Sequence, residues 1–159
     1  MSRCQELKGL PLNKGEIIRT SCDLDGRPVP DSGEPKHYFI VLSYLYYNKN
    51  MSKKAFLAIG LSSKSEWLYS RNLIIPDDFE NWSNAVSKGN YYQLFFNAVD
   101  ISYQADKVVR VCQENVEYPT GRKDPILRLK SVSLNRIVCD INYFMNLENE
   151  LTPPKKTYL

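Results

Sequence analysis

The chain has 159 residues, 43% of them hydrophobic and 25% charged, and this apolar content excludes wholesale disorder. Its 7 glycines and 9 prolines are too few for a collagen-like or low-complexity chain. The 21 basic and 18 acidic residues give a net charge of +3, which permits a polyanionic partner without requiring one. The length favours a single domain with a sizeable core.

Neither a membrane span nor an export signal is indicated by the sequence. No window approaches the roughly 20 continuous apolar residues of a transmembrane helix, and the first residues lack the apolar run of a secretory signal. We therefore expect a cytoplasmic protein. Its cysteines, Cys4, Cys22, Cys112 and Cys139, form no CxxC pair, and there is one histidine, so we expect no metal, no cofactor and reduced thiols.

Strands are predicted by short aliphatic and aromatic runs that turn residues separate. After an N-terminal arm over residues 1–13, these strands span residues 15–22, 36–47, 55–61, 73–75, 91–96, 101–103 and 107–112. The second contains the run HYFIVLSYLYY, which predicts a buried strand. The 11 tyrosines suit strands and half-buried surfaces, with base stacking as the alternative role.

A short helix is predicted between two of these strands, over about residues 77–87. Apolar residues recur there at helical spacing, and Asp77 or Asp78 is its expected cap. Consecutive strands without regular intervening helices argue against a parallel, doubly wound sheet. We therefore expect a single α+β domain that is mainly β, with a small bent antiparallel sheet or barrel over residues 14–126.

The clearest predicted element is an amphipathic C-terminal helix over residues 127–151. Its apolar residues recur at helical intervals, Ser131 or Ser133 is the expected cap, and two prolines begin the tail over residues 152–159. The apolar stripe either covers the sheet or forms the seam of a homodimer.

Conventional catalytic motifs are absent, because the sequence contains no GxxxxGK[ST], GxSxG, HExxH or GxGxxG. His37 is either a general acid or base, since histidine titrates near neutral pH, or a strand-edge side chain without chemistry. Residues 62–65 (SSKS) follow an apolar strand. Their hydroxyls and ammonium group either contact a phosphate or form a solvated turn.

Basic and aromatic residues are interleaved across the middle third of the chain. The basic positions are Lys49, Lys53, Lys54, Lys64, Arg71 and Lys88, and the nearby aromatic ones are Tyr46, Tyr47, Trp67 and Tyr69. Surfaces that bind single-stranded nucleic acids use this combination. The alternative is an ordinary solvated face, because such faces are also rich in charged residues.

Three short stretches follow one another along the chain: KGEII at residues 14–18, HYFIVLS at residues 37–43 and AIGLSS at residues 58–63. They resemble the first three strands of the MazF/PemK-like toxin family, whose members are small endoribonucleases of toxin–antitoxin systems. The resemblance covers residues 13–65 by pattern. Beyond them it extends to the order of elements, including the terminal helix.

The resemblance implies an SH3-like barrel, usually dimeric, that cleaves single-stranded RNA without a metal through attack of the RNA 2′-hydroxyl. An antitoxin protein or RNA would neutralise it. The catalytic candidates are then His37, Ser62 and Ser63, with His37 transferring the proton. The phosphate-binding candidates are Lys36, Lys64, Arg19 and Arg71. Bringing these residues onto one face requires the second and third predicted strands to be neighbours.

The sequence also departs from the family pattern. His37 stands where the family has its catalytic arginine, Tyr38 replaces the following proline, and Asn97 stands where some members carry a carboxylate. A histidine does not reproduce the planar guanidinium fork that grips phosphate. Two functions are therefore expected: an endoribonuclease toxin, or a non-catalytic RNA- or protein-binding module of phage or plasmid type on the same small barrel.

Overall fold

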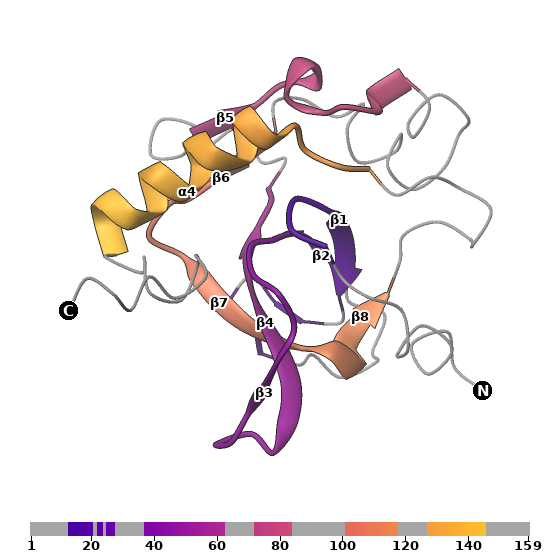
Figure 1. Ribbon diagram of the computed structural model, residues 1–159, viewed down its shortest axis with the longest axis vertical. Coiled ribbons are helices and arrows are strands. Elements are labelled where there is room, and N and C mark those ends of the chain that lie inside the picture. Colours follow the sequence, from indigo (N-terminus) through magenta and orange to yellow (C-terminus); the bar gives the residue numbers. More distant parts are fainter. Residues whose placement is uncertain are drawn as a thin grey trace.

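Figure 1 shows the computed structural model of the chain, in which a curved β-sheet lies beneath one long helix, α4. The structure describes residues 13–20, 22–23, 25–27, 37–62, 72–83, 101–117 and 127–145. Every strand pair within these residues is antiparallel. The expected fold class, α+β and mainly β, is confirmed.

Most of the described strands belong to one sheet. Its members are β1 (Ile17–Thr20), β2 (His37–Val41), β3 (Tyr46–Asn48), β4 (Lys53–Gly60), β7 (Val108–Cys112) and β8 (Val116–Glu117). The strand order is β3-β4-β2-β1-β8, and β7 pairs with the other edge of β4. A separate two-stranded sheet contains β5 (Asn72–Ile74) and β6 (Ile101–Tyr103).

The main sheet bends back on itself but does not close. β7 and β8 lie at opposite ends of the ladder β7-β4-β2-β1-β8, and only the 3-10 turn η3 (Gln113–Asn115) separates them along the chain. They are not paired with each other among the described residues. Of the two expected forms, the structure therefore shows the bent sheet and not a closed barrel.

Both faces of the sheet are buried, in two different cores. The helix-side core contains alternate residues of β2 and β4, including Tyr38, Ile40, Leu57 and Ile59, together with α4 and the β5–β6 sheet. The inner core, enclosed by the bend, contains the residues between them, including Phe39. Successive side chains of a strand point to opposite faces, so this double burial explains the continuous apolar runs in the sequence.

The strand predicted over residues 36–47 is divided in two by Ser43. β2 ends at Val41 and β3 begins at Tyr46. Between them the Ser43 hydroxyl oxygen accepts a hydrogen bond from the Leu57 N–H at 2.8 Å. The side chain thus replaces a backbone carbonyl as the acceptor, and the expectation of one continuous strand was wrong for that reason.

The Gly-Glu pair that opens the first predicted strand has a structural role. Gly15 has φ +87°, a conformation that side chains rarely adopt. Glu16 is 2% exposed, and its carboxylate accepts hydrogen bonds from the Asn13 N–H at 3.0 Å and from Arg128 at 3.3 Å. This motif therefore anchors the start of β1 to the segment before α4.

The C-terminal helix α4 (Ser131–Met145) begins four residues later than predicted. The residues before it are extended, because Leu127 accepts a backbone hydrogen bond from Ile17 at 2.9 Å and Leu129 donates one to Gly15 at 2.9 Å. On the helix, Ile137 and Ile141 are fully buried in the helix-side core. The apolar stripe thus covers the sheet, which is one of its two expected roles.

Most of the described part of the predicted short helix, residues 77–83, is not α-helical. Pro76–Asp78 forms the 3-10 turn η2, Phe79 is extended, and helical geometry begins only at Trp82. The Asp78 carboxylate accepts a hydrogen bond from the Ile75 N–H at 2.8 Å and does not cap a helix over residues 77–87. Residues 84–87 lie outside the described residues, as do the predicted strand over residues 91–96, the arm before Asn13 and the C-terminal tail.

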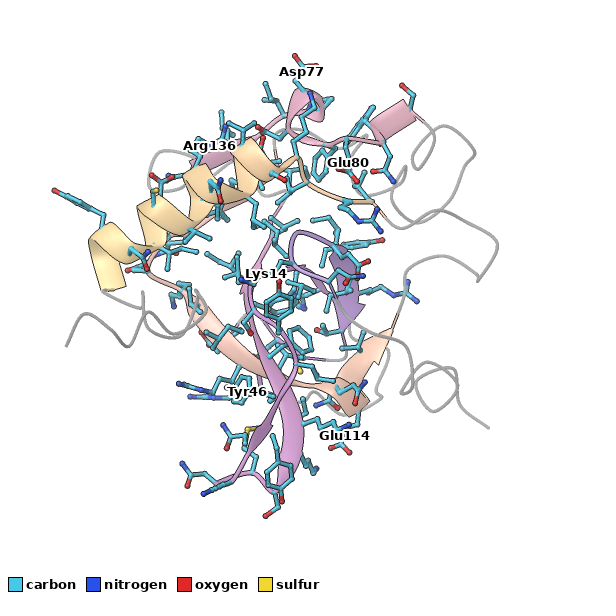
Figure 2. The ribbon with its side chains drawn as sticks, in the orientation of Figure 1. Lys14, Tyr46, Asp77, Glu80, Glu114 and Arg136 are labelled. Atoms are coloured by element: carbon cyan, nitrogen blue, oxygen red, sulfur yellow. The ribbon has the colours of Figure 1, made fainter. Side chains whose placement is uncertain are left out.

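Asp78 joins η2 to α4 in a buried polar junction. It accepts hydrogen bonds from the Ser133 hydroxyl at 2.9 Å and from Arg136 at 3.1 Å, so Ser133, one of the two predicted caps, does not cap the helix. Burial by itself would raise the pKa of Asp78, but the hydrogen bonds from Ile75, Arg136 and Ser133 outweigh it and lower that pKa. Figure 2 shows Arg136 on α4, on the same side of the molecule as η2.

In the described part of the chain, no helix has the combination of length and apolar character that crossing a bilayer requires.

Candidate functional site

The second and third predicted strands are neighbours in the structure, as the candidate site requires. In the β2–β4 pair, Phe39 lies opposite Gly60, and the Leu61 N–H donates to the Tyr38 carbonyl at 2.9 Å. Two residues further along this register, His37 falls opposite Ser62. The structure therefore brings together two of the three predicted catalytic residues.

A third polar residue extends this arrangement across the sheet, because Thr20 of β1 pairs with His37. We refer to Thr20, His37 and Ser62 as the polar row. All three lie on the inner-core face, since they alternate along their strands with residues of the helix-side core. Arg19 precedes Thr20 and so projects from the opposite face. The structure therefore separates this predicted phosphate-binding residue from His37.

His37 has a fixed hydrogen bond at one ring nitrogen. Its Nδ1 lies 3.2 Å from the Cys22 carbonyl oxygen. A carbonyl only accepts hydrogen bonds, so Nδ1 carries the proton and donates. In the neutral ring, Nε2 is then the nitrogen with the lone pair, which is the state of a general base. His37 as a whole residue is only partly buried.

The two hydroxyl residues of the polar row are more deeply placed. Thr20 is fully buried, and its Oγ1 accepts a hydrogen bond from the Cys22 N–H at 3.1 Å. Ser62 is 6% exposed, and its backbone exchanges two hydrogen bonds of 2.9 Å with Ser102 of β6. Cys22 thus accepts from His37 and donates to Thr20 through its main chain, which holds the end of β1 against the start of β2.

The Cys22 thiol of the inner core is protonated, and therefore a poor nucleophile, at neutral pH. Burial raises the pKa of Cys22 to about 11, and the hydrogen bond with Thr20 offsets only part of that rise. Burial also raises the pKa of Cys112. These two thiols and Cys139 are free.

The remaining candidates, Ser63, Lys36, Lys64 and Arg71, lie outside the described residues. Within the described ranges, no three His, Cys, Asp or Glu side chains are grouped in a way that could hold a metal ion. Sequence reasoning missed Thr20 and the main-chain role of Cys22. Thr20 could have been found from the strand register. The role of Cys22 could not, because every residue type carries a main-chain carbonyl.

No protein-family model matches the sequence, and no curated protein gives a significant match to it.

Proposed function

We propose that the protein is an endoribonuclease that cleaves single-stranded RNA, with His37 as the general base. The observation that carries this proposal is the Nδ1–H bond to the Cys22 carbonyl, which leaves the Nε2 lone pair of this partly buried residue to accept a proton. The bent sheet and the adjacency of β2 and β4 also agree with the resemblance to MazF/PemK-like toxins.

In this reaction Nε2 removes the proton from an RNA 2′-hydroxyl. The 2′-oxygen forms a bond to the adjacent phosphorus, the bond to the 5′-oxygen breaks, and a 2′,3′-cyclic phosphate remains. The leaving 5′-oxygen takes up a proton from water or from a second acid. Ser62 adjoins His37 across the sheet, and its chain neighbours Ser63 and Lys64 are the proposed contacts to the phosphate.

Lys36 and Arg71 complete the proposed phosphate contacts, and Arg19 is the least suited of the candidates because it lies on the other face. As a toxin the protein would act in the cytoplasm, with an antitoxin protein or RNA as its inhibitor, and a homodimer is the assembly that the resemblance implies.

A second function is favoured by a separate observation, the burial of the row's hydroxyls. Thr20 is fully buried and Ser62 is 6% exposed, so neither reaches far toward a polyanion. A module that binds RNA or protein without cleaving it requires no such access. This alternative predicts binding without new RNA ends.

The matched substitutions His37→Asn and His37→Gln test the proposal. Asparagine keeps a donor near the position of Nδ1, and glutamine keeps a polar group near that of Nε2, but neither can accept and release a proton at neutral pH. Cleavage of a labelled single-stranded RNA in the presence of EDTA should fall by about 10²- to 10⁴-fold in both variants. Unchanged cleavage would exclude His37 as the base, and no cleavage by the wild type would favour the binding module.

A further inference from the structure

Three tyrosines lie on the hairpin formed by β3 and β4 or just before it, and each is beside a cation. Lys14 places its Nζ 4.5 Å from the centre of the Tyr44 ring. Arg110 of β7 donates from Nε to the Tyr46 hydroxyl at 3.2 Å. Tyr47 lies opposite Lys54 in the β3–β4 register, so these two side chains share a face. Figure 2 shows Tyr46 on the hairpin and Lys14 above it.

Two of these rings contribute little to the protein core. Tyr44 is 63% exposed and Tyr47 is 61% exposed, whereas the buried aromatic residues of β2 and β4 are at most 6% exposed. Exposed aromatic rings that gather on one element mark an interaction surface more often than a packing requirement. We call the exposed rings of Tyr44 and Tyr47, with their neighbouring cations Lys14 and Lys54, the hairpin surface.

All charged side chains that the segment from His37 to Ser62 itself contributes are basic. No Asp or Glu occurs between His37 and Ser62, while Lys49, Lys53 and Lys54 fall in the hairpin. Lys53 is hydrogen-bonded to Glu114, which partly neutralises it and raises its pKa. Among the described residues, neither Lys49 nor Lys54 forms an ion pair.

We propose that the hairpin surface binds single-stranded nucleic acid. Exposed rings stack on unpaired bases, and cations beside them contact the phosphates that connect those bases. β3 is an edge strand of the described sheet, and its Tyr47 shares a face with Lys54. An acidic peptide would use the lysines but not the rings, so the observed pairing of each ring with a cation favours nucleic acid.

This surface is distinct from the polar row and does not depend on the proposed cleavage. Lys54 and Ser62 are eight residues apart along β4 and its extension, which corresponds to roughly 26 Å. The two sites therefore lie at opposite ends of the sheet. A protein that binds RNA at the hairpin without cutting it remains consistent with the inference.

The experiment measures fluorescence anisotropy of a labelled 12-nucleotide oligouridylate, its DNA counterpart and a labelled polyglutamate peptide of the same length. The full-length chain carries His37→Asn, so cleavage does not disturb binding. We expect Tyr47→Ala to weaken binding of both oligonucleotides about tenfold or more, and Tyr47→Phe to restore it. Lys54→Ala should weaken binding and lower the slope of log K against log salt by about 0.7.

Lys53→Ala is the matched control. This neighbouring lysine is paired with Glu114, and it alternates with Lys54 along β4, so it is on the face opposite Tyr47. Its affinity should stay within about twofold of the parent. The inference is overturned if the parent does not bind either oligonucleotide at low salt, or if Tyr47→Ala binds as tightly as the parent while its thermal melt is unchanged. Polyglutamate binding that equals oligonucleotide binding would also overturn it and identify an acidic protein partner.

Discussion

The junction at Asp78 provides a stability prediction that follows directly from the structure. We expect Asp78→Ala to lower the free energy of unfolding by about 2.5–4.5 kcal/mol at pH 7. Ser133 is 5% exposed and loses the acceptor of its hydroxyl, which costs about 1–3 kcal/mol. The lost hydrogen bond from the Ile75 N–H adds about 1 kcal/mol. Arg136 is 49% exposed, so its ion pair contributes only about 0.5 kcal/mol.

The same junction predicts a pH dependence. The pKa of Asp78 is lower in the folded chain than its ordinary value of 3.8, so the stabilisation is complete above about pH 4 and is lost as the pH falls through the folded value. The difference between the wild type and Asp78→Ala should therefore be smaller at pH 2.5 than at pH 7.

Urea unfolding followed by tryptophan fluorescence measures this difference, and the exposed neighbour Asp77 supplies the control. Asp77→Ala is expected to change the free energy of unfolding by about 0.5 kcal/mol or less. A loss below about 1 kcal/mol in Asp78→Ala at pH 7, or an equal loss in Asp77→Ala, would refute the reasoning.

Three further outcomes are expected. Tyr103→Phe should cost about 1–2 kcal/mol in chemical denaturation, since the buried hydroxyl donates to Asp140 Oδ2 at 2.8 Å; a neutral result would contradict this role. Gly26→Ala should cost about 1–3 kcal/mol, because φ is +81° and an added Cβ would lie 2.9 Å from Val109; unchanged thermal unfolding would refute it. Iodoacetamide at pH 8 should leave Cys22 unmodified in the folded chain, as its pKa is raised to about 11, and rapid modification seen by mass spectrometry would count against the buried assignment.

Much of the fold could be predicted because burial on two faces leaves a strong signal in the sequence. The runs that became β2 and β4 are continuously apolar, since alternate residues enter the two cores. The break at Ser43 could not be predicted, because it depends on a hydroxyl that accepts the N–H of a residue on another strand. The late start of α4 has a similar cause, since Leu127 and Leu129 pair with residues near the chain start.

The candidate site was predictable in part for the same physical reasons. The adjacency of His37 and Ser62 follows once the two apolar runs pair as antiparallel neighbours. Their surroundings did not follow, because the partner of His37 is the main-chain carbonyl of Cys22 and the burial of Ser62 comes from its bridge to Ser102. Such main-chain contacts depend on the path of the backbone in three dimensions, so no pattern of amino-acid types in the sequence indicates them.

The most direct test of the proposed reaction is the chemistry of the cut RNA. A single-stranded RNA that the protein cleaves is compared with the same oligonucleotide carrying one 2′-deoxynucleotide on the 5′ side of the cut, and the products are identified by mass spectrometry. We predict a 2′,3′-cyclic phosphate from the first, no cut at the modified position of the second, and loss of RNA cleavage in His37→Asn. Cleavage at the 2′-deoxy position, or full activity of His37→Asn, would contradict it.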